Sequence, residues 1–264
     1  QLKKKEQYKG SYGIWKATLK QLIKYTGDKL LFKEIDKTFI EGFVDYLLND
    51  ARMANNQKLT PSTAKCYYSK LKACINQAIK ENIIHSNPCE NIIINNQYQH
   101  KREYLTLEEV RKIVKTECRY KELKKAFLFS CLTGLRWSDI EKLKWSEVQK
   151  TENGYKIVFH QQKTKGLQYL DISEQAREYL GSEGMPQEKV FTNLKYSVLV
   201  NNELLKWVQA AGIKKKITFH CARHTFATLQ LTVGTDLYTL SKLLGHTDIK
   251  TTQIYANIID EKKR

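Results

Sequence analysis

The stretch FHCARHTFAT, residues 219–228, is the most informative part of this chain. It predicts a helix that runs to about residue 233. His220 lies three residues before Arg223, a spacing that puts both side chains on one side of a helical turn. A guanidinium fork matches the oxygens of a phosphate and does not lose its charge. The pair is therefore a candidate phosphate-binding group.

Two shorter stretches add groups of the same kind. TGLR, residues 133–136, ends in Arg136, and LLGH, residues 243–246, ends in His246. Each stretch contains a glycine expected to end a helix, so both side chains are expected to be presented at a corner. Tyr255 follows nine residues after His246, in a helix predicted over residues 248–258. Two arginines, two histidines and a phenol suit the cleavage of a phosphodiester by tyrosine without a metal.

A lysine completes the candidate set. Residues 155–160 and 167–172 alternate like two paired strands, and Lys163 lies in the turn between them. Lys165 is two residues away and is the alternative. Each residue alone is weak evidence, since surface His/Arg pairs are common and most tyrosines on amphipathic helices are core. The hypothesis of a single site depends on the order and spacing of these residues taken together.

The first ninety residues predict helices. Apolar residues at helical spacing occur over 12–23 and over 40–48. A third helix is expected after Pro61, with Ser62 as its N-cap. Asn87-Pro88 is expected to end this helical module, because a residue before proline resists the helical conformation. Residues 89–103 are interpreted as a linker.

The second part of the chain begins with the capping box Thr106 to Glu109. A helix is expected over residues 120–132, ended by Gly134. Ser138 with Glu141 reads as a second capping box that starts a new helix at once. Asp139 is interpreted as a capping or supporting acid rather than a catalyst. Further helices are expected over 173–180, 196–210, 222–233 and 237–244.

Composition points to a polyanionic partner. The 264 residues carry 45 Lys/Arg and 28 Asp/Glu, a formal charge of +17. Residues 1–104 hold 18 bases and 10 acids, and the remainder holds 27 and 18, so both halves are basic. Nucleic acid is the leading candidate. A lysine-rich proteome is the alternative explanation of this charge.

Other classes of protein find no support in the sequence. The six cysteines form no CxxC pair, so reduced thiols are expected and a zinc site is not. No apolar run is long enough to span a membrane. The start, Gln1-Leu2-Lys3-Lys4-Lys5, is unlike a signal peptide and has no initiator Met. The chain is interpreted as an interior part of a longer protein. That protein is expected in the cytoplasm of a bacterium, in association with the nucleoid.

These motifs together resemble the tyrosine recombinase, or phage-type integrase, family. TGLRWSDI at 133–140, FHCARHTFAT at 219–228 and LLGHTDIKTTQIYA at 243–256 are similar to its three signature segments. QQKTKGLQYLDI at 161–172 is similar to its lysine hairpin. The resemblance implies a mainly α fold with a small β-sheet or hairpin. It implies a helical core-type DNA-binding domain over 1–88 and a mixed α/β catalytic domain over 104–264.

The resemblance also implies roles for the site residues. Tyr255 is the nucleophile that forms a 3′-phosphotyrosyl link, and Lys163 is the general acid. The phosphate is held by four side chains, Arg136, Arg223, His220 and His246, with His220 a candidate for the tyrosine proton. No cofactor, ATP or metal is implied. The implied partners are double-stranded DNA, further copies of the chain in a tetramer, and accessory DNA-bending or excision factors.

Three alternatives remain open from sequence. A type IB topoisomerase shares the chemistry but acts as a monomer without synapsis. A non-catalytic DNA-binding module would not need Tyr255. A metal-independent ribonuclease would use the histidines and arginines without a covalent adduct. Two departures from the family stand out: only nine residues follow Tyr255, and no complete arm-binding domain precedes the first helix.

Overall fold

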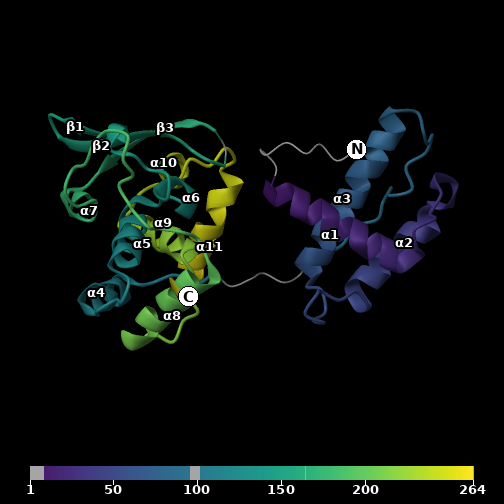
Figure 1. Cartoon of the computed structure of the whole chain (residues 1–264), viewed down its shortest axis with the longest axis horizontal. Helices are drawn as coiled ribbons and strands as arrows, with labels where there is room; N and C mark the ends of the chain where they lie inside the picture. Colours follow the sequence, from purple (N-terminus) through teal and green to yellow (C-terminus); the bar gives the residue numbers. More distant parts are fainter. Residues whose placement is uncertain (1–8, 96–101, 164, 264) are drawn as a thin grey trace. The chain divides into compact units, whose positions relative to one another are not determined.

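The chain divides into two compact units, residues 1–100 and 101–264 (Figure 1). A computed structural model describes residues 9–95, 102–163 and 165–263. Each unit has its own hydrophobic core. The fold class expected from sequence, mainly helical with a small sheet, is confirmed.

The first unit is built of helices. They are α1 (Lys9–Thr26), the short 3-10 helix η2 (Phe32–Glu34), α2 (Lys37–Asn49) and α3 (Pro61–Lys80). Its core joins one face of α2, with Ile40, Phe43 and Leu47, to Leu71 and Ile75 of α3. These positions recur every three or four residues, so each helix buries one stripe.

The N-cap of α3 differs from the prediction. Thr60, not Ser62, is the N-cap, and its hydroxyl accepts from the amide of Thr63 at 3.2 Å. Pro61 is the first helical residue, where its missing amide hydrogen costs nothing. The helix therefore starts at the proline rather than after it.

The first unit extends beyond the boundary expected at residue 88. Cys89 and Ile94 are buried in its core. The Tyr68 hydroxyl donates to the carbonyl of Ile92 at 3.1 Å. Residues 89–94 therefore pack on the helical unit and are not a linker, while the rest of the expected linker up to residue 101 includes positions outside the described residues.

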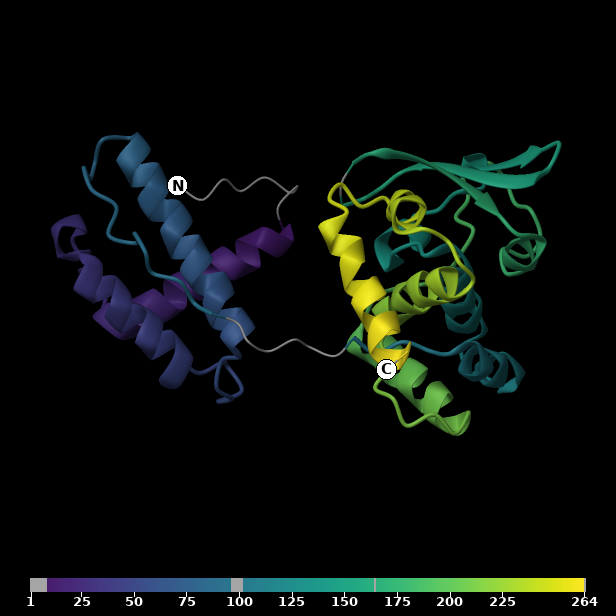
Figure 2. The same cartoon turned by 180° about the vertical axis from the view of Figure 1, so that it is seen from behind.

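The second unit holds eight α-helices within the described residues, a 3-10 helix and a sheet. The elements are α4 (Leu107–Lys115), α5 (Lys121–Thr133), α6 (Trp137–Ile140), η3 (Trp145–Glu147), β1 (Val148–Thr151), β2 (Gly154–His160), β3 (Leu167–Ile172), α7 (Glu174–Glu178), α8 (Val198–Ala210), α9 (His220–Thr232), α10 (Leu237–Leu243) and α11 (Lys250–Lys263). The strands form one antiparallel sheet in the order β1-β2-β3. Both views place this sheet at one end of the unit and α4 and α8 at the other (Figures 1 and 2).

The central helices α5 and α9 pack on each other and carry the core of this unit. Phe127 of α5 meets the rings of Trp207 and Phe219 edge-on, with centroids 5.9 and 5.7 Å apart. Helix α11 lies alongside α9, as both views show (Figures 1 and 2). The last two segments of the predicted site are thereby brought side by side.

Local signals in the second unit are confirmed with one exception. Thr106 and Glu109 cap α4 reciprocally, and the hairpin pairs residues 155–160 with 167–172. The capping box of Ser138 and Glu141 is wrong: Arg136 occupies the N-cap of α6 and makes no side-chain cap bond. Because α6 begins at Trp137, the pair is out of register with the capping positions. Strand β1 was not predicted.

No described helix is long and apolar enough to cross a membrane. Four of the six cysteines are buried, at positions 89, 118, 131 and 221.

Candidate active site

Arg136 stands in a turn that only glycine permits. Gly134 ends α5 with φ of 70°, the left-handed region expected from sequence. A Cβ at this position would lie 2.5 Å from a ring carbon of Phe226, so the turn also needs the missing side chain. Arg136 follows as a half-buried N-cap residue. The turn thus brings Arg136 close to α9.

Arg223 is buried rather than presented. Its side chain is 3% exposed. The guanidinium donates to the carbonyl of Gly134 at 2.7 Å and to that of Leu244 at 2.5 Å. Two backbone carbonyls far apart in the sequence therefore hold Arg223 inside the unit. A guanidinium has five donors, so these bonds leave three for a phosphate.

The two predicted histidines lie in the field of the arginines. Burial, then the charges of Arg223 and Arg136, lower the pKa of His246 to about 4. Burial, then the charges of Arg223 and Arg136, also lower the pKa of His220, and the charge of Lys163 lowers it further. Both rings are therefore neutral at pH 7. His246 Nδ1 lies 2.8 Å from the hydroxyl of Thr252, which orients the ring.

Tyr255 is also buried, at 2% exposure. Burial raises the pKa of its phenol, against the lowering effect of Arg223, Arg102 and Arg136. The arginines by themselves would stabilise the phenolate. In this state the loss of solvent outweighs them, so the phenol is protonated at neutral pH.

Two residues of the site were missed by sequence reasoning. His224 lies 2.8 Å from the Tyr255 hydroxyl through Nδ1. Arg102 donates a side-chain hydrogen bond to the same hydroxyl and contributes to the pKa shifts of His220, His224 and Tyr255. His224 is part of the quoted segment 219–228 and gave a signal that could have been followed. Arg102 lies 153 positions from Tyr255 and gave none.

Asp139 supports the hairpin loop. It is 5% exposed, and its carboxylate accepts from the backbone amide of Gln162 at 2.8 Å. It also raises the pKa of Arg223, which burial lowers to about 9. The residue next to Gln162 is Lys163. Asp139 therefore joins the arginine turn to the lysine loop, the supporting role expected of it.

Lys163 is exposed and close enough for its charge to act on His220. Lys165 is exposed too and takes a left-handed φ of 61°, with its carbonyl 3.4 Å from His160 Nδ1. The charge interactions link all six predicted residues, Arg136, Lys163, His220, Arg223, His246 and Tyr255, into one cluster.

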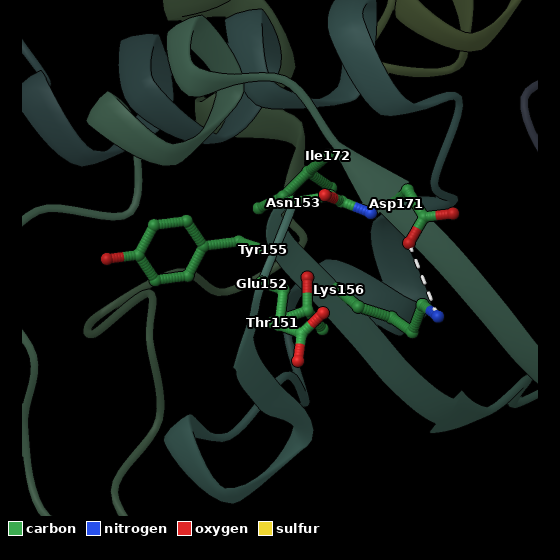
Figure 3. A pocket seen from close by; sticks show the side chains of 7 residues that line it. All are labelled: Thr151, Glu152, Asn153, Tyr155, Lys156, Asp171 and Ile172. Atoms are coloured by element: carbon green, nitrogen blue, oxygen red, sulfur yellow. Dashed lines mark ion pairs between the residues drawn. The ribbon is translucent and has the colours of Figure 1, made fainter.

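A separate hollow lies at the other end of the hairpin, beside the turn between β1 and β2 (Figure 3). Its wall includes Tyr155 and the ion pair between Lys156 and Asp171, whose atoms are 3.5 Å apart. None of the six predicted residues lines it. The hollow is therefore separate from the arginine cluster.

Known families match both units. A model described as the phage integrase family matches residues 103–262. This chain belongs to the phage integrase family. A model described as a phage integrase SAM-like domain matches residues 1–99. The chain is thus a tyrosine-type recombinase, as expected from its motifs.

Relatives and solved structures agree. The integrase-family chain is 26% identical over 238 residues to a tyrosine recombinase of Pseudothermotoga lettingae, covering 88% of this chain and 81% of the relative. It is 28% identical over 263 residues to tyrosine recombinase XerD of Oceanobacillus iheyensis, covering 92% and 86%. Two solved structures share the fold. XerH site-specific recombinase bound to a palindromic difH substrate has 19% identity, a TM-score of 0.75 and coverage of 96% and 77%. A lambda integrase dimer bound to a core site has 20% identity, a TM-score of 0.71 and coverage of 94% and 88%.

Proposed function

We propose that this recombinase cuts and rejoins DNA at specific sites, through a 3′-phosphotyrosyl link on Tyr255, to integrate or excise a mobile element. The cluster of Arg136, Arg223, His220, His246 and Lys163 around one buried phenol carries the proposal. Those side chains supply charge and hydrogen bonds for a phosphate. The phenol supplies the nucleophile.

The chemistry follows from the cluster. Arginine donors stabilise the negative charge that develops on the non-bridging oxygens, the kind of interaction that contributes most to catalysis of such reactions. Tyr255 attacks phosphorus, and Lys163 protonates the departing 5′-hydroxyl. A free 5′-hydroxyl from a partner duplex then reverses the step. The bond energy stays in the phosphotyrosyl link, so we expect neither ATP nor a divalent metal to be needed.

Double-stranded DNA is the proposed substrate. The charge of +17 is spread over both halves of the chain, which favours contact of both units with one polyanion. A lambda integrase tetramer bound to a Holliday junction shares the fold, with a TM-score of 0.70. We therefore propose that four copies act on paired DNA sites at the nucleoid, with accessory DNA-bending or excision factors as further partners.

A covalent-capture experiment tests this function. Duplexes that bind the chain are recovered from a randomised pool, nicked to trap the intermediate, and incubated with the protein in EDTA. We expect a denaturation-resistant adduct. Tyr255→Phe should abolish the adduct yet bind DNA within a few-fold, because one hydroxyl adds little to a phosphate-dominated interface.

The outcomes separate the alternatives. An adduct formed by Tyr255→Phe would refute the nucleophile. Relaxation of supercoiled DNA by a monomer, without recombination, would indicate a topoisomerase. Cyclic phosphate ends on RNA without an adduct would indicate a ribonuclease. Full biological activity of Tyr255→Phe would indicate a binding module.

A further inference from the structure

The nucleophile has a close partner that the proposed mechanism does not use. His224 follows Arg223 in α9, and its Nδ1 lies 2.8 Å from the hydroxyl oxygen of Tyr255 in α11. The rings are 5.6 Å apart between centroids. Both residues are buried, with 7% and 2% exposure. Such a short contact within a buried pair fixes where the phenol proton can go.

Arg102 also contacts the phenol oxygen. Its guanidinium donates to the Tyr255 hydroxyl oxygen. A guanidinium has only donors, so it cannot receive the phenol proton. The pKa of Tyr255 is raised, so the phenol keeps its proton at neutral pH. In the tautomer of His224 that carries its proton on Nε2, Nδ1 is bare and accepts the phenol proton across this 2.8 Å contact.

The charges around His224 agree with a neutral ring. Burial, then His220, Arg102 and Arg223, lower its pKa to about 3. His220 also meets it edge-on, with ring centroids 4.7 Å apart. These residues, with Tyr255, are the titratable and charged groups that face His224 from α9, from the segment before α4 and from α11.

We propose that His224 is a catalytic residue of this site, whose Nδ1 takes the proton of Tyr255 as the phenol oxygen attacks phosphorus. The inference rests on the function proposed above. The oxygen–phosphorus bond forms while the O–H bond breaks, and the imidazole becomes an imidazolium. The bond from phosphorus to the 5′-oxygen breaks, and that oxygen takes a proton from Lys163. In the rejoining step His224 returns its proton to Tyr255.

The DNA phosphate itself enables this base. In the free protein the surrounding cations disfavour an imidazolium. A bound phosphodiester brings one negative charge among Arg102, Arg136 and Arg223, which offsets their field and favours protonation of His224. His224 therefore gains basicity only when a phosphate is in place, so the phenol is not ionised without substrate.

The test compares His224→Asn with His224→Leu. Asparagine places a carbonyl oxygen where Nδ1 stood, so it can accept the hydrogen bond but cannot keep the proton. Leucine has a similar volume and does neither. Thr228→Val is the matched control, one turn along the same buried face of α9 and bonded only to backbone carbonyls. Adduct formation on the captured, nicked duplex is timed from neutral to alkaline pH.

We expect both His224 variants to form the adduct more slowly at neutral pH, by roughly the 10²–10⁴-fold typical of a lost base. Their rates should rise about tenfold per pH unit toward the pKa of the phenol, as hydroxide replaces the imidazole. The parent and Thr228→Val should not show that rise. An asparagine variant within a few-fold of the parent, or a deficit that is constant with pH, would overturn the proposal and leave His224 a positioning residue.

A second measurement needs no His224 variant to fold. The parent protein is labelled with nitrogen-15 in its histidines, and its nitrogen–proton NMR spectrum is recorded. The signal of His224 is assigned as the one that shifts in Tyr255→Phe. We expect this signal to show the ring proton on Nε2. A proton on Nδ1 would overturn the proposal, because that nitrogen could not then accept another. Failure of the proposed function looks different: the parent itself would form no adduct through Tyr255.

Discussion

Arg223 is expected to contribute to folding as well as to chemistry, and Arg223→Ala separates the two contributions. The guanidinium donates to two buried backbone carbonyls, of Gly134 and Leu244. Hydrogen bonds from a charged donor contribute about 1.5–3 kcal/mol each. Two of them give roughly 3–6 kcal/mol before the structure relaxes, against a total of about 5–15 kcal/mol for a typical domain. The second unit should remain folded with a much lower free energy of unfolding.

Urea unfolding followed by tryptophan fluorescence measures this loss. Three of the four tryptophans, at 137, 145 and 207, lie in the second unit, and Trp15→Phe as background removes the signal of the first. Arg223→Lys keeps the positive charge and should recover part of the lost stability. The recovery should be incomplete because an ammonium cannot reach both carbonyls. Arg111→Ala, at an exposed position of α4, is the control and should change little. A loss below about 1 kcal/mol for Arg223→Ala would refute the argument that these bonds hold the site together.

Three further predictions concern the loop, the turn and the two units. Lys163→Ala should slow adduct formation by roughly 10²–10⁴-fold. A DNA substrate with a 5′-bridging phosphorothiolate should rescue this variant, because its sulfur leaves without a proton. Rescue of Lys165→Ala instead would assign the general acid to Lys165. Gly134→Ala should lower the melting temperature, since its φ of 70° and the 2.5 Å approach of Phe226 both oppose a Cβ; an unchanged melting temperature would contradict this account. Residues 101–264 alone, which keep Arg102, should bind DNA more weakly and with a shallower salt dependence, because phosphate contacts of the first unit are lost. An unchanged slope would mean that the first unit does not touch DNA.

Local sequence signals determined most of the helices, the hairpin and the identity of the six candidate residues. The capping pair of Thr106 and Glu109 and the alternation over 155–172 each act within a few residues, so they survive any change in the rest of the fold. Where several local signals competed, sequence reasoning chose wrongly. Thr60 rather than Ser62 caps α3 because the proline between them can itself be the first helical residue.

Tertiary packing alone decided how the site is held. Arg223 finds its carbonyls 89 and 21 positions away, and Tyr255 finds His224 31 positions away. No spacing rule connects such residues; they meet because α5, α9 and α11 pack together. Burial then sets the charge states, since loss of solvent around Tyr255 outweighs three arginines and keeps the phenol protonated. The sequence pointed to six candidate residues, but the charge states of their side chains depend on distances that exist only in the folded chain.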